Sequence, residues 1–189
     1  DVDDRAASAC LQVRRRGLDV TTECYPYTAF ATGIGSAVFD PGWQERFGLD
    51  YGDLQWAATG ERLTAESFAR YQKQGGLVIA HAIPESVVRA SVAHPLTSIC
   101  SDGRLTNGRG HPRSSGSFAR ALGHYVRETK ALSLMEALRK MTILPARRVE
   151  RRAPAIRRKG RIAIGADADL TGFDPQRVID RATYAEPAK

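Results

Sequence analysis

The chain has 189 residues, 42% of them hydrophobic and 26% charged, which is enough apolar material for one folded domain with a sizeable core. No apolar run approaches the roughly 18 residues of a membrane helix, and the acidic start is unlike a signal peptide. The sequence therefore predicts a cytoplasmic protein with no membrane contact. The three cysteines are widely spaced and suggest neither a disulfide framework nor a structural zinc ribbon: Cys10, Cys24 and Cys100.

Segments with helical and with strand-like patterns alternate along the chain. The spacing of apolar residues predicts a helix over residues 5–16, and a run of strand-forming residues predicts a strand over 18–25. Six glycines and a proline within residues 33–62 break this rhythm. They predict an irregular insertion with at most short helices.

The alternation resumes after the insertion. Apolar spacing and end signals predict a helix over 64–74, a strand over 77–81, a helix over 84–93 and a strand over 96–101. A capping box at Ser133-Leu-Met-Glu136 predicts the start of the last long helix, and Pro145 is expected to interrupt it. This order is typical of a parallel α/β sheet or barrel. Because a closed barrel needs eight strands, the sequence predicts either a small open sheet or the second part of a larger enzyme.

The last part of the chain has a different pattern. Residues 160–174 contain short apolar stretches around a Gly165-Ala-Asp turn, which predicts two short strands. A two-stranded ribbon is unstable alone, so these strands are expected to belong to a sheet completed by residues missing here. We therefore expect a chain that is truncated at both ends, with residues 1–150 forming one part and 151–189 another.

Positive charge is concentrated in one segment. The formal net charge is +7, and residues 147–161 carry a dense run of basic side chains that could neutralise phosphates. The segment has no aromatic residue for base stacking and no surrounding nucleic-acid-binding motif. We interpret it as a solvated helix end, or as a surface that pairs with acidic groups, and expect no nucleic-acid partner. One alternative to an enzyme is therefore a non-catalytic module that binds its partner through this basic segment.

The most informative stretch is Ile99-Cys-Ser-Asp-Gly103 with the glycine-rich loop that follows it. Asp102 comes at the carboxyl end of a predicted buried strand, where parallel α/β barrels keep their chemistry. His111 and Arg113 add a titratable group and a planar positive fork nearby. Taken alone, Ser101-Asp-Gly is also typical of an ordinary turn after a strand.

Four motifs in one order carry a family resemblance. They are Asp19-Val-Thr-Thr-Glu-Cys-Tyr-Pro-Tyr-Thr-Ala29, Ser101-Asp-Gly with His111-Pro-Arg113, Leu132-Ser-Leu-Met-Glu-Ala-Leu-Arg-Lys-Met-Thr142 with Pro145-Ala-Arg147, and Gly160-Arg-Ile with Gly165-Ala-Asp-Ala-Asp-Leu170. Together they resemble the C-terminal part of the N-acyl-D-amino-acid deacylases, or D-aminoacylases, a branch of the metal-dependent amidohydrolase superfamily. The resemblance implies the last strands and helices of a TIM-like (β/α)8 barrel over residues 1–150, followed over 151–189 by short strands of a small composite β-sandwich.

The resemblance also implies a zinc-dependent enzyme that hydrolyses the amide bond of an N-acyl-D-amino acid. A metal-activated water attacks the acyl carbonyl, and a carboxylate passes the water's proton to the departing amine. That carboxylate is implied to be Asp102, at the end of the eighth barrel strand, and Asp102 is also a candidate ligand of a second metal. Arg113 matches a position that holds the substrate carboxylate. Tyr25, at the end of the sixth strand, matches another substrate-side position.

Two histidines are further substrate-side candidates. His111 could orient Arg113 or reach the substrate, and a structural role in the loop is the alternative. His81 ends the strand predicted over 77–81, taken as the seventh of the barrel, and its alternative is a histidine held by the strand-end backbone.

The implied cofactor is Zn2+, one ion or two, held mostly by residues that would precede residue 1. The implied partner is a small-molecule N-acyl amino acid, with homo-oligomerisation left open, and the isolated chain is expected to be inactive. Within the superfamily, a cyclic-amide hydrolase of the dihydroorotase or hydantoinase kind is the alternative.

Overall fold

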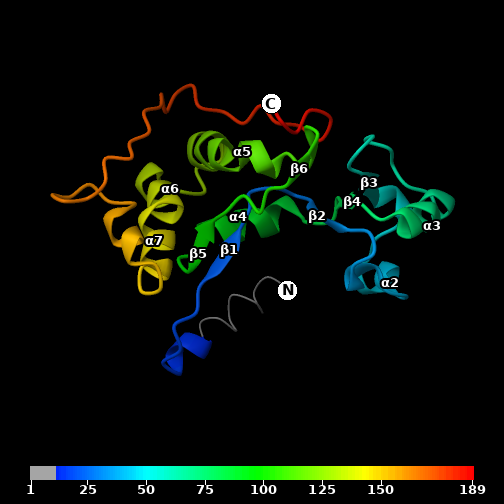
Figure 1. Cartoon of the computed structure of the whole chain (residues 1–189), viewed down its shortest axis with the longest axis horizontal. Coiled ribbons are helices and arrows are strands. Elements are labelled where there is room, and N and C mark those ends of the chain that lie inside the picture. The colour runs from blue at the N-terminus through cyan, green and yellow to red at the C-terminus, as the bar shows by residue number, and fades with distance from the viewer. Residues whose placement is uncertain (1–11) are drawn as a thin grey trace. The chain divides into compact units, whose positions relative to one another are not determined.

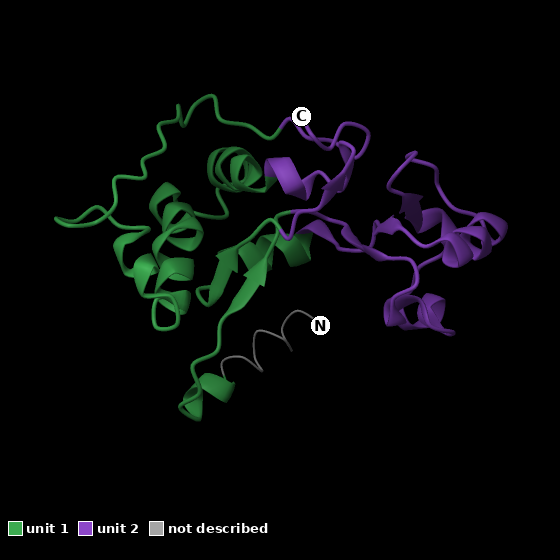
Figure 2. Cartoon of the chain, viewed as in Figure 1, with its two compact units in different colours: residues 1–26, 86–101, 117–180 green, residues 27–85, 102–116, 181–189 purple. Residues whose placement is uncertain are grey.

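The computed structural model describes residues 12–189, and its contacts divide the chain into two compact units (Figure 1; Figure 2). Unit 1 comprises residues 12–26, Ser86–Ser101 and Ser117–Asp180, and unit 2 comprises Tyr27–Glu85, Asp102–Gly116 and Arg181–Lys189. Each unit is therefore built from segments that lie far apart in the sequence. The helix expected over 5–16 is present over residues 12–15, and the rest of it, like Cys10, lies outside the described residues.

The sheet of unit 1 is a parallel pair of strands. Strand β1 (Thr22–Cys24) lies beside β5 (Thr97–Ile99), with Thr22 opposite Thr97. The hydroxyl groups of these two threonines are 2.8 Å apart and hydrogen bonded, and all three residues of β5 are buried. The two strands predicted over 18–25 and 96–101 are confirmed in shorter form, and their parallel pairing agrees with an α/β fold.

Strand β4 (Leu77–Ala80) is the centre of a separate, antiparallel sheet in unit 2. It pairs with β2 (Phe30–Gly33) on one side and with β3 (Leu54–Trp56) on the other. The expectation that residues 77–81 form the seventh strand of a parallel barrel is therefore wrong. The strands before Tyr25 and Asp102 likewise cannot be the sixth and eighth of a barrel, because β1 and β5 pair directly with each other. A short apolar run fits a buried strand in either kind of sheet, so the pattern alone does not distinguish the two.

The region expected to be an irregular insertion contains a strand. Between β2 and β4 the chain forms the short helices η1 (Ala37–Phe39), α2 (Trp43–Phe47) and η2 (Tyr51–Asp53), followed by β3. The short helices agree with the prediction, and β3 corrects it. All three residues of β3, including the polar Gln55, are buried, and a run of only three residues is too short for a period-two pattern to stand out in the sequence.

Aromatic packing joins β3 to helix α3 (Ala65–Gln74) in the core of unit 2. The indole of Trp56 stacks on the ring of Tyr71, with centroids 4.0 Å apart and planes 9° from parallel. The predicted start of α3 is confirmed, because the hydroxyl of Thr64 accepts the backbone N–H of Ser67 and the hydroxyl of Ser67 accepts that of Thr64. The cap and the stacked rings together fix α3 on the sheet.

The remaining helices lie mostly in unit 1. They are α4 (Glu85–Ala93), α5 (Arg113–Arg120) with a continuing π-helix (Ala121–Glu128), α6 (Leu134–Met141), α7 (Ile143–Val149) and η4 (Pro154–Arg158). Ser133 caps α6 as predicted, since its hydroxyl accepts the backbone N–H of Glu136 at 3.2 Å. Thr142 separates α6 from α7, because Pro145 has no N–H for the carbonyl four residues earlier and its ring crowds that carbonyl. Within the described chain, none of these helices is long and apolar enough to cross a membrane.

The C-terminal segment differs from its prediction. The structure forms no strand among residues 159–189, so the two strands expected over residues 160–174 are absent there, and Ile162 and Ile164 are exposed. A short two-stranded ribbon with no neighbouring sheet buries too little apolar surface to be stable. The assignment of residues 151–189 to a composite β-sandwich stays a prediction.

Several side chains of the basic segment, residues 147–161, pair with carboxylates of unit 1. Arg148 lies 2.7 Å from Asp19, and Arg161 lies 2.6 Å from Glu150. These pairs fit the interpretation of the segment as a surface that pairs with acidic groups. The expected absence of a nucleic-acid partner stays a prediction.

Adding a methyl group at Gly76, just before β4, should destabilise unit 2. The φ angle of Gly76 is +140°, and a Cβ there would lie 2.3 Å from the Trp56 ring. The indole is stacked on Tyr71 and has little room to move, so Gly76→Ala should lower the free energy of unfolding by about 2 kcal/mol or more. Gly75→Ala is the matched control, because its φ is +74° but a Cβ there meets open space. Urea unfolding compares the two variants, and equal losses would show that contact with Trp56 does not matter.

Candidate functional site

Asp102 lies in the irregular segment that follows β5. Its φ of +43° is in the left-handed region, which aspartate tolerates better than most side chains. The next residue, Gly103, passes so close to Ser114 that a Cβ would lie 2.6 Å from the Ser114 Cα. The backbone after Asp102 therefore packs directly against the start of α5 (Arg113–Arg120), while the side chain of Asp102 remains 65% exposed.

The loop then forms a hairpin, in which β6 (Leu105–Thr106) pairs with β7 (Arg109–Gly110). The two connecting residues, Asn107 and Gly108, have φ angles of +51° and +72°, as a two-residue hairpin turn with two left-handed residues requires. Glycine content alone predicts only a flexible loop. The Asn-Gly pair is the sequence signal that predicts the hairpin.

An ion pair joins two of the predicted site residues. The Nη2 atom of Arg113 lies 2.8 Å from a carboxylate oxygen of Asp102 and donates a hydrogen bond of 3.2 Å to the carbonyl of Ala31. The Arg113 side chain is only 6% exposed, so its charge needs these acceptors. The arginine therefore anchors the carboxylate from the protein side while the carboxylate itself stays in contact with solvent.

His111 is held in one neutral form. Its Nε2 donates to the carbonyl of Ala29 at 2.9 Å, and its Nδ1 accepts the backbone N–H of Arg113 at 3.0 Å. Burial, reinforced by the nearby Arg113 charge, lowers the pKa of His111 to about 3. The imidazole therefore fixes the backbone where α5 begins and does not exchange protons near neutral pH.

Two tyrosines pack edge-on against the His111 ring. The ring centroids of Tyr27 and Tyr184 lie 5.3 Å and 5.2 Å from it, and the hydroxyl of Tyr27 donates to the carbonyl of Pro112. Neither tyrosine is among the predicted site residues. Tyr27 belongs to a motif of the family resemblance, whereas nothing in the local sequence around Tyr184 links it to His111.

His81, which follows β4, belongs to the same aromatic cluster. Its ring centroid lies 4.6 Å from that of Tyr184, and its Nε2 donates to the side-chain oxygen of Gln55 at 3.0 Å. Burial and the charge of Arg62 lower the pKa of His81 to about 4. The ring of His81 is thus held by a side chain from β3 rather than by the strand-end backbone alone.

The end of β1 in unit 1 carries Tyr25 and Cys24. Tyr25 is half-buried, and the other four predicted site residues belong to unit 2, so a position of Tyr25 beside the substrate stays a prediction. Cys24 and Cys100 are free thiols. Burial is the main cause that raises the pKa of Cys24 to about 12, and the nearby Cys100 adds to it. The thiol is therefore un-ionised and unreactive at neutral pH.

The described residues do not by themselves fit a zinc ion. Among residues 12–189, no group of three histidine, cysteine, aspartate or glutamate side chains could hold a metal. Asp102, the one predicted ligand in this chain, has a guanidinium beside it instead. A complete metal site would need further ligands.

The chain is similar to known deacylases over most of its length. Residues 2–188 match the amidohydrolase family. The chain is 32% identical to an N-acyl-D-glutamate deacylase from Alcaligenes xylosoxydans xylosoxydans, over 93% of this chain and 36% of that protein. It is 33% identical to a D-aminoacylase from the same organism, over 90% of this chain and 36% of that protein.

Solved structures show the same likeness. The crystal structure of an N-acyl-D-glutamate deacylase from Bordetella bronchiseptica, complexed with zinc and a phosphonate inhibitor, matches with a TM-score of 0.77 and 32% identity, covering 98% of this chain and 40% of that one. The chain therefore belongs to the amidohydrolase family, and its resemblance to the D-aminoacylase branch is confirmed. It spans about a third of the length of the curated relatives that it matches.

Acid should destabilise unit 2 through His111. The pKa of this residue is about 3 in the folded chain and 6.5 in the unfolded chain, so the unfolded state takes up the proton first as pH falls. The stabilisation is complete above pH 6.5 and is lost as pH falls from 6.5 toward 3, by up to about 1.4 kcal/mol per pH unit. The free energy of unfolding measured in urea should be about 2 kcal/mol lower at about pH 5 than at about pH 8 because of His111.

His111→Gln is the control for this effect, because glutamine does not titrate. The pH dependence should be shallower in this variant, with a remaining contribution of the same sign from His81. An equally steep dependence in His111→Gln would assign the effect to other groups.

Proposed function

We propose that the protein containing this chain hydrolyses the amide bond of N-acyl-D-amino acids, which are small molecules. The names of its relatives, an N-acyl-D-glutamate deacylase, an N-acyl-D-aspartate deacylase and a D-aminoacylase, support this substrate class. The observation that carries the proposal is the exposed carboxylate of Asp102, anchored by the buried Arg113. All these names describe linear N-acyl amino acids, so a cyclic-amide substrate is not proposed.

Asp102 is the proposed general base and acid. Amide hydrolysis requires a group that takes a proton from the attacking water and returns it to nitrogen, because an amide anion is a very poor leaving group. A carboxylate does both if it is fixed in place and accessible. The Asp102 carboxylate lies 2.8 Å from Nη2 of Arg113, and 65% of its side chain is exposed. The C–N bond then breaks to give a carboxylate and a free amino acid.

Arg113 is the proposed partner of the substrate carboxylate. A guanidinium has five N–H donors in one plane, so it can hold more than one carboxylate at a time. In this structure it already holds Asp102 and the carbonyl of Ala31. The same side chain would therefore place the substrate carboxylate and the catalytic carboxylate in a fixed relation to each other.

Zinc is the proposed cofactor, since the Bordetella deacylase structure contains it. Such an ion supplies Lewis-acid activation of water and of the acyl carbonyl. The residues described here do not complete a zinc site, so we propose that the other ligands lie in the part of the protein that this chain does not span.

His111 and His81 are proposed to position the site residues rather than to react. His111 bonds the backbone of Arg113, and Tyr184 packs against both histidines. Both are neutral at pH 7 in this setting, which suits positioning groups better than proton donors. Tyr25 is proposed, from the family resemblance, to contact the substrate.

Replacing the carboxylate of Asp102 by an amide should abolish most of the activity. Asparagine has nearly the same shape and tolerates the left-handed backbone, so Asp102→Asn should fold, but it cannot take a proton from water. Turnover of an N-acyl-D-amino acid should fall by at least about 10²-fold. Asp40→Asn, at an exposed position of unit 2, is the matched control. Near-normal turnover of Asp102→Asn at saturating substrate would overturn the assignment.

Replacing the fork of Arg113 by a point charge should impair recognition of the substrate. Arg113→Lys keeps the positive charge and loses the planar donors, so kcat/KM on N-acyl-D-amino acids should fall by about 10-fold or more. A matched amide without the carboxylate should be much less affected. Equal losses on both substrates, together with lowered stability, would assign Arg113 to holding the loop alone.

A further inference from the structure

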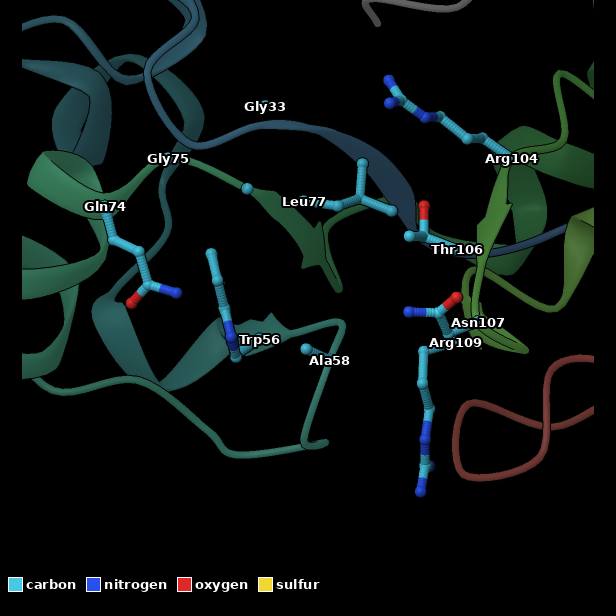
Figure 3. Close-up of a pocket in the computed structure, with 11 residues that line it drawn as sticks. Gly33, Trp56, Ala58, Gln74, Gly75, Leu77, Arg104, Thr106, Asn107 and Arg109 are labelled. Carbon is cyan, nitrogen blue, oxygen red and sulfur yellow. The ribbon is translucent and has the colours of Figure 1, made fainter.

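A cavity of about 760 Å³ lies within unit 2, beside the hairpin formed by β6 and β7 (Figure 3). Its volume is in the range of sites that hold small metabolites. The hairpin lies on one side of it, and Trp56 and Leu77 lie on the other. Neither Asp102 nor Arg113 lines it, so the proposed function gives this cavity no role.

Two arginines of the hairpin region line this cavity. Residues two apart on a strand share a face, as do directly opposed residues of an antiparallel pair. Thr106 is directly opposed to Arg109 across the hairpin, and Arg104 comes immediately before β6. All three line the cavity, whereas Leu105 and Gly110 on the other face do not.

The charge of the lining is positive. Arg104 and Arg109 are the two charged residues among the described residues that line the cavity, and no carboxylate accompanies them. Arg109 also donates to the carbonyl of Ala185 at 3.1 Å, which restrains its side chain. Asn107 and Gln74 add side-chain amides that can donate further hydrogen bonds.

The opposite wall is apolar and rigid. Trp56 is buried and stacked on Tyr71, and it presents part of its indole beside Leu77. Gly76 lies so close to the indole that any larger residue would displace it, as shown above. A planar or aliphatic group would therefore meet a preformed surface here.

We propose that this cavity binds a small organic anion, with a carboxylate or phosphate drawn to the positive hairpin side that carries Arg104 and Arg109 and an apolar body against Trp56 and Leu77. A guanidinium recognises both head groups through charge-assisted hydrogen bonds. The inference is independent of the proposed deacylase activity, because it rests on other residues and is tested by binding rather than turnover.

Calorimetric titration of the purified protein with three matched probes tests the proposal. Phenylacetate and phenyl phosphate carry the two head groups on one ring, and phenylacetamide is the neutral counterpart of phenylacetate. At least one anion should bind about 10-fold or more tightly than the neutral amide, since charge-assisted bonds are about twice as strong as neutral ones. The tighter of the two anions identifies the head group.

Two variants assign the binding to this cavity. Arg104→Gln with Arg109→Gln should weaken binding of the preferred anion by about 10-fold or more. Arg147→Gln with Arg151→Gln removes the same charge from exposed positions of unit 1 and should leave binding unchanged. Thr106→Asp, at an exposed hairpin position that tolerates polar residues, should place a carboxylate opposite Arg109 and also abolish binding.

Three results would overturn the proposal. They are no binding of either anion, equal binding of the neutral amide, and full binding by the Arg104→Gln/Arg109→Gln protein. A cooperative thermal unfolding transition shows that a variant is folded. If the Arg104→Gln/Arg109→Gln protein is unfolded, Thr106→Asp provides the test instead. If the unaltered protein binds an anion but does not hydrolyse N-acyl-D-amino acids, the proposed function is wrong and the anion site stands.

Discussion

A single buried imidazole holds together the segments that form the candidate site. His111 donates to the carbonyl of Ala29 and accepts from the backbone of Arg113, so it joins two stretches of chain 82 residues apart. Only the neutral ring can play both roles, because a protonated ring would turn a donor toward the N–H of Arg113. Burial and the neighbouring arginine enforce that neutral form by lowering the pKa of the ring. The rings of Tyr27 and Tyr184 pack against it in edge-on contacts.

The position of Asp102 follows from this anchor. His111 fixes the first turn of α5, the first residue of α5 is Arg113, and the guanidinium of Arg113 reaches back to the carboxylate. An ion pair with both partners on the surface contributes little, because both side chains lose rotational freedom to make it. Here one partner is already immobilised by packing, so only the carboxylate loses freedom. The result is an exposed acid in a well-defined place, which is what a proton-transfer group requires.

Local sequence signals predicted the parts of this arrangement that depend on near neighbours. The strands around Cys24 and Ile99, the cap at Ser133 and the closeness of Arg113 to Asp102 are all present in the structure. Each depends on residues within a few positions, or on a motif whose spacing carries the geometry.

Distant pairings were beyond the reach of such signals. The run at Leu77–Ala80 is buried in any sheet, so its pattern is the same whether its neighbours are parallel or antiparallel. The partner of His81 is Gln55, an inconspicuous residue within a region expected to be irregular. For residues 160–174, sequence propensity predicted strands, but a strand also needs a partner, and the described chain provides none.

The contribution of Tyr184 bears on the order in which unit 2 can assemble. The carbonyl of this residue accepts from the side chain of Gln55, 129 positions earlier, and its ring packs on both His81 and His111. A ribosome releases the sheet and the hairpin long before it releases Tyr184. Until then the two histidines lack part of the apolar cover that keeps them neutral. The electrostatic character of the site is thus completed only after its strands have been synthesised, by loop closure over a long stretch of chain.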